Sequence, residues 1–457
     1  MTKQELETLF EANRARFLSE WEHFLTFPSI SIAPEHADDC VRCVEWLAAH
    51  LRAMGFAVRL IPTVSHPVLL AERAGRPGAP TVLFYGHYDV QPVDPVELWA
   101  TPPFEPSIRD GRVYARGAED NKGQLFAALK AIETLIRSDR LNATMKILIE
   151  GDEETGRMPL LKVLDQEKDA LRAELVMAAD TGTVASGAPT LTVGLRGIVH
   201  LTAVLKGPSH DLHSGVHGGR APNPANGMAR LVASLHDASG RVAVPGFYDG
   251  IHEPSAEERR LANAAPIDRA WYESVTGVPP VGGEQAYTPI ERTGFRPAID
   301  LNGFHSGYGG AGSKTIIPAQ AEVKISARLV PGQQPARVLE QIIDHLRRGV
   351  PPGLHLEITD QGIGGPAVRV PIEAPAVRLA REVMAELSDL PTAFLWEGAS
   401  VPILSYLPAV VGGQALLVGF GSEQDNIHAP NESYSLEQFK LGYLYTALFL
   451  SRLGQNK

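Results

Sequence analysis

Short apolar strands alternate with helical patterns over the first 190 residues, and this alternation limits the possible folds more than any other feature. Runs of strand length occur at Thr81–Tyr85, Met145–Ile149 and Glu174–Ala178. Helical patterns lie between and after them, at Asn121–Arg137 and Pro159–Ala170. Continuous apolar strands that alternate with helices are typical of a parallel sheet covered on both faces. The sequence therefore predicts an α/β fold with a mostly parallel sheet sandwiched by helices.

The pattern changes in the middle of the chain, where longer strands of antiparallel type are expected. Thr190–Lys206 and Thr315–Val330 alternate apolar and polar residues, as strands with one buried face do. Helical patterns accompany them at Asn223–His236 and Pro335–Arg348. These elements predict a second, α+β domain.

The second domain is interpreted as an insertion into the first. The strand and helix alternation resumes after Gly362–Gly365 (GIGG), which we interpret as a return hinge. We therefore expect one domain formed by residues 1–192 and 366–457, interrupted by an inserted domain at residues 193–365.

Composition and charge exclude several functional classes. The 457 residues carry a formal net charge of -11, which argues against general nucleic-acid binding. No apolar run approaches the roughly 18–20 residues of a membrane helix, and the first 25 residues do not resemble a secretory signal. The only cysteines, Cys40 and Cys43, are expected to be reduced thiols on one helix. We expect a soluble cytoplasmic protein that binds neither nucleic acid nor membrane.

Five polar clusters stand at or just past the ends of predicted core strands. They are Gly86–Asp89 (GHYD), Gly117–Gly123 (GAEDNKG), Glu150–Gly156 (EGDEETG), Ala179–Thr181 (AADT) and Asn426–Glu432 (NIHAPNE). Because ligands of such sheets bind beyond the carboxyl ends of the strands, these side chains should meet at one edge. So many acids repel one another unless a cation lies among them. Since no Lys/Arg cluster of matching size accompanies them, the clusters predict bound divalent metal.

The types of ligand limit the choice of metal. Histidines and carboxylates without a thiolate suit zinc, cobalt or manganese. Two histidines and several acids can hold two ions if one carboxylate bridges them.

The order and spacing of these motifs resemble those of the M20 metallopeptidases, and most of all the carnosinase-like cytosolic dipeptidases. The likeness is carried by YGHYDVQP, ARGAEDNKG, EGDEETG, HDLHSG and IPAQAEVKISARLVP, and continues in EGASVP and IHAPNE. It spans the chain from about Tyr85 to near the C-terminus.

Carried over residue by residue, the resemblance implies two divalent metal ions per chain. His87 and Asp180 would hold one ion, and Glu154 and His428 the other. Asp120 would bridge the two. The expected metal is Zn²⁺, with Mn²⁺ or Co²⁺ as alternatives.

The resemblance also implies the groups that support the chemistry. Asp89 would hydrogen-bond His87 and fix its tautomer, and the peptide bond after Asp120 would be cis. Glu153 would be the general base, which takes a proton from a metal-activated water and passes it to the leaving amine. Neighbouring residues of an extended segment point in opposite directions, which agrees with separate roles for Glu153 and Glu154.

The inserted domain would act as a lid and as the interface of a homodimer. His213, in HDLHSG, would reach into the active site of the partner subunit. Arg328, in SARLVP, would grip the substrate carboxylate with its guanidinium. Lesser polar contacts would come from Thr315, Ser400 and Gly398. One residue departs from the dipeptidase pattern, since Ile363 stands where those enzymes carry a histidine that touches the same carboxylate.

These features predict a metallopeptidase that cleaves the amide bond of a dipeptide or a similar small peptide-like substrate. Ile363 keeps open the alternative of an N-acyl amino acid amidohydrolase of the same fold. The presence of Glu153 argues against a metal-binding protein without turnover. P-loop, Rossmann and serine hydrolase functions are excluded, because neither glycine-rich motif follows a strand of the early βα units and G-x-S-x-G is absent.

Overall fold

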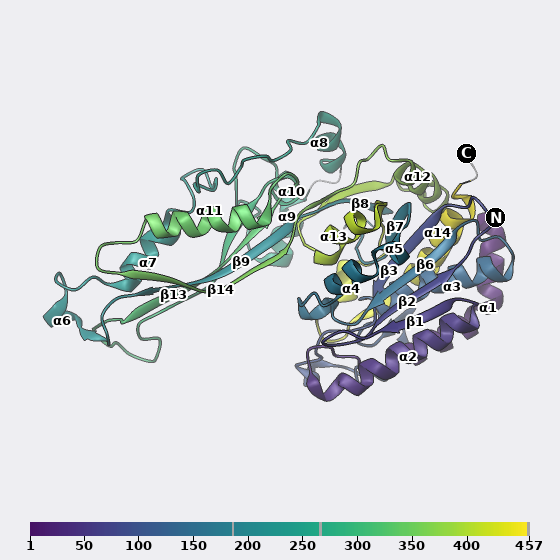
Figure 1. Ribbon diagram of the computed structural model, residues 1–457, viewed down its shortest axis with the longest axis horizontal. Coiled ribbons are helices and arrows are strands. Elements are labelled where there is room, and N and C mark those ends of the chain that lie inside the picture. The colour runs from purple at the N-terminus through teal and green to yellow at the C-terminus, as the bar shows by residue number, and fades with distance from the viewer. Residues whose placement is uncertain (185–186, 265–266, 455–457) are drawn as a thin grey trace. The chain divides into compact units, whose positions relative to one another are not determined.

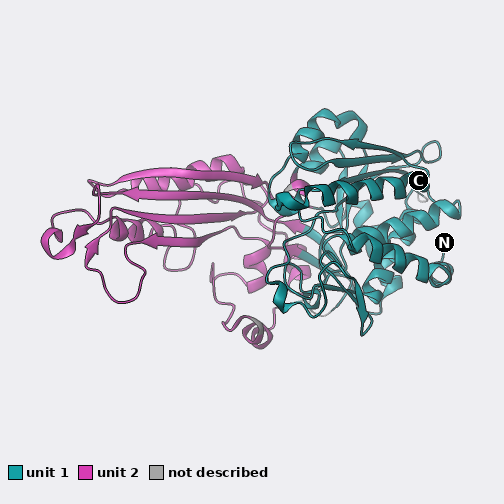
Figure 2. Ribbon diagram, turned by 90° about the horizontal axis from the view of Figure 1, so that it is seen from below, with its two compact units in different colours: residues 1–193, 370–395, 406–457 teal, residues 194–369, 396–405 magenta. Residues whose placement is uncertain are grey.

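The computed structural model describes residues 1–184, 187–264 and 267–454, and the chain divides into two compact units. Unit 2 is inserted into the chain of unit 1 (Figure 2). Unit 1 comprises Met1–Val193, Val370–Leu395 and Tyr406–Lys457, and unit 2 comprises Gly194–Arg369 and Trp396–Ser405.

The largest sheet contains nine strands among the described residues (Figure 1). They are β1 (Ala57–Ile61), β2 (Val68–Arg73), β3 (Thr81–His87), β6 (Thr144–Glu150), β7 (Leu175–Ala178), β8 (Thr190–Leu195), β15 (Val368–Arg369), β16 (Ala393–Glu397) and β17 (Gln414–Leu417). The order is β1-β2-β6-β3-β7-β17-β8-β15, with β16 paired to β8. The four strands β6-β3-β7-β17 are parallel, and the strands that flank them pair antiparallel. The predicted α/β fold is thus confirmed, with antiparallel edges added.

Helices cover this sheet, and one of them is buried almost throughout. The helices of this part of the chain are α1 (Lys3–Leu25), α2 (Ala37–Ala53), α3 (Lys122–Arg137), α4 (Leu160–Gln166), α5 (Lys168–Leu171), α12 (Pro375–Leu387), α13 (Pro402–Val411) and α14 (Leu436–Arg452). Helix α3 is buried from Lys122 to Leu135, because α1 and α14 both pack on it. Trp21 of α1 stacks on Phe439 of α14 with ring centroids 4.6 Å apart. The packed helix begins at Lys122, two residues after Asp120.

Unit 1 also contains a small three-stranded sheet and four short 3₁₀ turns in its described part. The sheet has the order β18-β5-β4. Its strands are β4 (Ser107–Arg109), β5 (Arg112–Tyr114) and β18 (Ser433–Ser435), and the turns are η1 (Pro34–His36), η2 (Val96–Leu98), η3 (Glu153–Thr155) and η4 (Glu423–Asp425). Pairing of Ser433 with Tyr114 brings the C-terminal part of the chain beside the segment that precedes α3.

Unit 2 is built on an antiparallel sheet with the order β11-β13-β9-β14 in its described part. The strands are β9 (Gly197–Lys206), β11 (Ala298–Ser306), β13 (Gln320–Leu329) and β14 (His355–Gly365), and a separate pair joins β10 (Leu212–His213) to β12 (Ile316–Ile317). The helices are α6 (Ser214–His217), α7 (Pro224–Ala233), α8 (Ala256–Ala262), α9 (Arg269–Thr276), α10 (Pro289–Gly294) and α11 (Pro335–Arg348). Alternate residues of β9 and β13 form a core with α7 and α11. In neither unit does the described part contain a helix long and apolar enough to span a membrane.

Several predicted elements are shorter or longer than expected. The strand expected over Thr190–Lys206 breaks at Arg196 into β8 and β9, and the helix expected over Pro159–Ala170 breaks into α4 and α5. The interpretation of GIGG as a hinge is wrong, because these residues continue β14. A Cβ at Gly362 would meet the His200 ring at 2.3 Å. A side chain at position 362 would therefore require the exposed His200 ring to move.

Candidate functional site

Two groups of possible metal ligands meet in the described part of unit 1 and share one carboxylate. The first group is His87, Asp120 and Asp180, and the second group is Asp120, Glu154 and His428. In each group, one ligand atom per residue lies within 4.8 Å of the others. The structure therefore brings together all five residues that the sequence proposed as ligands.

Three of the ligands follow neighbouring parallel strands. His87 ends β3, Glu154 lies in η3 just after β6, and Asp180 follows β7. Their meeting agrees with the rule that ligands bind beyond the carboxyl ends of parallel strands.

The expectation that all five clusters follow core strands is wrong for the other two ligands. Asp120 follows β5 of the small sheet, and His428 follows η4. Both reach the site because β18 pairs with β5, which brings their loops together.

In the first group, the imidazole of His87 is oriented for a cation. Its Nε2 lies 3.2 Å from Asp120 Oδ1 and 3.6 Å from Asp180 Oδ1, yet this buried atom has no hydrogen-bond partner. On the other side of the ring, Nδ1 lies 3.1 Å from the carbonyl oxygen of Asp89 and 3.4 Å from its Oδ1. A proton on Nδ1 leaves the Nε2 lone pair facing two carboxylates, which is the arrangement that a metal ion needs.

The second group is arranged in the same way around the other oxygen of Asp120. His428 Nε2 lies 3.0 Å from Asp120 Oδ2 and 3.2 Å from Glu154 Oε2. The bonds to these carboxylates raise the pKa of His428 to about 10. Burial and the charge of Asp120 raise the pKa of Glu154 to about 7. Excess negative charge thus surrounds both imidazoles, and the ligand types fit divalent cations.

Glu153 belongs to neither group, although it lies next to Glu154. The expected extended segment is wrong, because residues Glu153–Thr155 form the 3₁₀ turn η3, which ends at Gly156 with φ 65°. Successive side chains of a 3₁₀ turn still diverge by about 120°. Burial raises the pKa of Glu153 well above its usual value; the charges of Asp180 and Glu154 add to this, while His87 opposes it.

Hydrogen bonds hold the ligands of the first group. The Asp120–Asn121 peptide bond is cis, as expected. Asn121 Nδ2 donates to Asp180 Oδ1 at 3.0 Å. Asp89 Oδ2 accepts from Ser31 Oγ at 2.7 Å and from the backbone N–H of Glu154 at 3.1 Å.

Residues without an assigned role also hold the ligand loops. Gln91 Nε2 donates to Glu154 Oε2 at 2.8 Å. Glu432 is buried, pairs with Arg116 and accepts from the backbone N–H of Asp120. Both Gln91 and Glu432 lie inside motifs that the sequence singled out, but their partners are distant in sequence, so no spacing pattern could reveal them.

In unit 2, three predicted substrate contacts lie together. Arg328 donates to Ser400 Oγ at 2.8 Å, Ser400 Oγ donates to the carbonyl oxygen of Arg196, and Arg196 Nε donates to the carbonyl oxygen of Gly398 at 2.9 Å. Burial and the neighbouring Arg328 lower the pKa of Arg196 to about 10. Among the described residues neither guanidinium forms an ion pair with a carboxylate, although Asp300 acts on both at longer range. Two uncompensated cations are suited to bind an anion.

His213 and Thr315 lie elsewhere in unit 2. His213 pairs with Ile316 across β10 and β12, and its exposed ring accepts at Nδ1 from the backbone N–H of Gly215 at 3.0 Å. The chain enters β13 at Gln320, and Arg328 lies near the other end of that strand, roughly 25 Å away at about 3.3 Å per residue. The structure therefore does not bring His213 or Thr315 to Arg328 within one chain.

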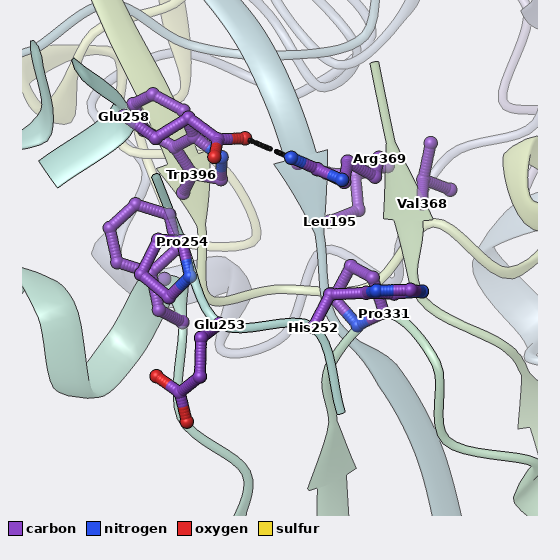
Figure 3. Close-up of a pocket in the computed structure, with 12 residues that line it drawn as sticks. Leu195, His252, Glu253, Pro254, Glu258, Pro331, Val368, Arg369 and Trp396 are labelled. Carbon is purple, nitrogen blue, oxygen red and sulfur yellow. Dashed lines mark hydrogen bonds and ion pairs between the residues drawn. The ribbon is translucent and has the colours of Figure 1, made fainter. Parts of the chain in front are cut away.

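A small cavity of unit 2 is not a substrate site. It is lined by His252, Glu253 and Trp396 among others, and Glu258 accepts from Arg369 at 2.8 Å beside it (Figure 3). Its volume of about 20 Å³ has room for about one water molecule. None of the ligand groups found in the described residues includes a residue of this cavity.

The sequence and fold of this chain are similar to those of known peptidases. The family model of Peptidase family M20/M25/M40 matches residues 83–452. Cysteinylglycine-S-conjugate dipeptidase of Corynebacterium striatum is 29% identical over 97% of this chain and 96% of its own length. Beta-Ala-His dipeptidase of Rattus norvegicus is 27% identical over 97% of this chain and 95% of its own. The crystal structure of an M20 family metallo-carboxypeptidase from Sulfolobus solfataricus superposes with a TM-score of 0.83 and 31% identity, covering 95% of this chain and 98% of that one.

A third group of possible ligands, Glu20, His50 and Glu133, already contains a cation. The buried ammonium of Lys130 contacts Glu20, lies 2.7 Å from His50 Nε2 and lies 2.8 Å from Glu133 Oε2. Because this amine neutralises the acids, we assign the group to the core of unit 1 and not to a metal.

This assignment predicts a pH effect on stability. Burial, and then the charge of Lys130, lower the pKa of His50 from 6.5 to about 4. Between these values the unfolded chain binds one more proton than the folded chain, so His50 stabilises the fold fully above about pH 6.5 and loses this effect as the pH falls towards 4. His50→Gln should flatten the loss of stability over this range in urea titrations of the metal-free protein. His355→Gln, at an exposed position, is the control, and an unchanged slope in His50→Gln would contradict the assignment.

Proposed function

Since this chain belongs to peptidase family M20/M25/M40, we propose that it is a two-metal dipeptidase. It hydrolyses the amide bond of a dipeptide or a similar small peptide-like substrate. The observation that carries this proposal is the position of Asp120, whose two oxygens face two different groups of ligands. The names of the relatives, which refer to Beta-Ala-His and Cysteinylglycine conjugates, support the class of substrate.

The ligands fit two divalent ions, with zinc preferred. His87 and Asp180 would bind one ion, Glu154 and His428 the other, and Asp120 both. Imidazoles and carboxylates without a thiolate also suit manganese and cobalt. When bound, the ions would polarise the scissile carbonyl and acidify the attacking water.

Glu153 is the proposed general base. Its carboxylate lies outside both ligand groups, and the negative charges of Asp180 and Asp120 help to raise its pKa. A nearby acid of this kind can take a proton from the attacking water and return it to the leaving amine. Asp89 holds the proton of His87 on Nδ1, which keeps Nε2 available as a ligand.

The substrate carboxylate is proposed to bind at Arg328. Ser400 and Gly398 lie beside it, and Arg196 adds a second positive charge. A guanidinium fork suits a carboxylate. Thr315 stays a proposed lesser contact, supplied by a second copy of the chain because it directly precedes β12, beyond the end of β13 that is opposite to Arg328.

A second candidate function is N-acyl amino acid amidohydrolase activity. It is favoured by Ile363, an apolar side chain that is 39% exposed at the position where dipeptidases of this type carry a histidine. Without the histidine, one hydrogen-bond donor to the substrate carboxylate is lost, which weakens the preference for a leaving group with a free C-terminal carboxylate.

We propose that the active unit is a homodimer formed through unit 2. His213 lies in the β10–β12 pair, next to the end of β13 that is opposite to Arg328, so His213 can join a site that contains Arg328 only from a second copy of the chain. Isologous dimers of this kind supply each site with residues from both subunits.

A cytoplasmic location is part of the proposal. Cys40 and Cys43 are both free and buried on α2. A thiol pair that stays reduced fits a reducing compartment.

Glu153→Gln should reduce kcat by about 10²–10⁴-fold, the usual contribution of a general base. Elemental analysis should still find two metal ions per chain, because Glu153 is not a ligand. Glu154→Gln is the matched control and should lose metal. Turnover close to that of the wild type, or fewer than two ions in the wild type, would contradict the proposal.

Arg328→Ala should lower kcat/KM for a dipeptide by about 10–100-fold, since a hydrogen bond to a charged group contributes about 1.5–3 kcal/mol. The C-terminal amide of the same dipeptide should be affected much less. Arg337→Ala, which removes an exposed guanidinium of unit 2, is the control. Equal losses on both substrates would remove the role of Arg328, and a wild-type preference for N-acyl amino acids would favour the second candidate function.

His213→Ala should lower kcat without loss of metal. Mixing it with Glu153→Gln should restore about a quarter of wild-type activity, because half of the dimers are mixed and one of their two sites is intact. The mixture is measured after dissociation and reassociation of the subunits. No recovery on mixing would argue that each site is formed within one chain.

A further inference from the structure

A buried ion pair lies behind the metal ligands and has no role in the mechanism above. Glu432 and Arg116 are each 1% exposed, and Arg116 donates to Glu432 Oε2 at 2.8 Å. The second terminal nitrogen of Arg116 donates to the carbonyl oxygen of Pro92 at 2.9 Å. The pair therefore joins three loops of unit 1 that are far apart in sequence.

The carboxylate of Glu432 organises the loop that carries Asp120. Its Oε2 accepts from the backbone N–H of Gly117 at 2.9 Å. Its Oε1 accepts from the backbone N–H groups of Glu119 and Asp120 at 3.0 and 3.1 Å. With the bond from Arg116, one side chain satisfies four donors and sets the backbone directly at the shared ligand.

Glu432 also lies at the end of the loop that carries His428. Asn426, His428 and Asn431 of this loop have φ of 55°, 60° and 63°, a conformation that residues other than glycine adopt only when their surroundings impose it. Asn431 is held by bonds to the backbone at Ala100 and Leu98. Anchors at Asn431 and Glu432 thus keep the loop in this conformation.

The first group is held by a different set of bonds. Ser31 Oγ donates to Asp89, whose carbonyl and carboxylate face His87 Nδ1. Asp89 also accepts from the backbone N–H of Glu154, so this residue contacts both groups. Asn121 holds Asp180. Of the three ligands of the first group, only Asp120 is attached to Glu432.

We propose that Glu432 is a positioning residue for the second group of metal ligands. It acts through two of the three members of that group, Asp120 and His428. In the first group it acts only through Asp120, which both groups share. Bonds behind metal ligands typically change metal affinity by 10–100-fold. This inference rests on the proposed two-metal site and predicts that the two ions depend on different supporting residues.

The test is calorimetric titration of the metal-free protein with Zn²⁺. The wild type should bind two ions. Glu432→Gln, which keeps the size of the side chain but places an amide against the guanidinium of Arg116 and the N–H of Gly117, should weaken one of the two binding events at least tenfold and the other less than threefold. Asn121→Ala, which removes the bonds to Asp180 and to the backbone N–H of His87, should weaken the other event, so that a double variant weakens both.

Glu133→Gln is the control for loss of a buried carboxylate, since Glu133 pairs with Lys130 and Arg16 within α3 and α1 and supports neither group of ligands. Glu133→Gln should lower the thermal stability without changing the affinity for either metal ion.

The inference is overturned if Glu432→Gln keeps both affinities, or if it weakens both by similar factors. If Glu432→Gln does not fold, Arg116→Lys, which keeps the charge but loses the bond to Pro92 or to Glu432, should weaken the same event, and unchanged affinities would again overturn the inference. A wild type that binds one ion would instead contradict the two-metal proposal itself.

Discussion

The structure depends on one electrostatic constraint, which is the crowding of carboxylates around Asp120. Asp120, Asp180, Glu153 and Glu154 gather where three parallel strands end, and in the described part of the chain the ion-pair partners of these acids are His87 and His428, not lysine or arginine. In water each acid would be ionised, but here burial and mutual repulsion raise the pKa of Glu153 and Glu154. Two histidines face the acids with their ring nitrogens. Such an arrangement is stable only with added positive charge, and that requirement determines the chemistry that the fold can support.

The contrast with the group around Lys130 shows how the same residue types reach a different outcome. Glu20, His50 and Glu133 also place ligand atoms close together, but a buried ammonium lies among them. The acids there are neutralised by the chain itself. Among the described residues the groups around Asp120 form no ion pair with a lysine or arginine, and this difference distinguishes them from the structural cluster around Lys130.

The central sheet and the meeting of three of the proposed ligands could be predicted from the sequence, because both depend on local patterns. His87, Glu154 and Asp180 directly follow apolar strands, and the ends of parallel strands meet. Asp120 and His428 could be assigned only by the resemblance of their motifs, since their loops are brought in by pairing of β18 with β5. Glu432 and Arg196 could not be predicted, because their partners lie about 200–300 residues away in the chain. The strand conformation of GIGG could not be predicted for a related reason, because its neighbours His200 and Ile198 belong to β9, far away in the sequence.

The turn that contains Gly398 and Ser400 forms three hydrogen bonds with Arg196. The backbone N–H of Arg196 donates to Ala399 at 3.1 Å, its side chain donates to Gly398, and Ser400 donates to its carbonyl oxygen. Arg328 is bonded to the same serine. These side chains therefore lose their conformational entropy when the chain folds, and not when a ligand binds. For the carboxylate binding proposed at Arg328, a preordered turn would make the affinity depend on where the carboxylate lies, and so on the length of the substrate.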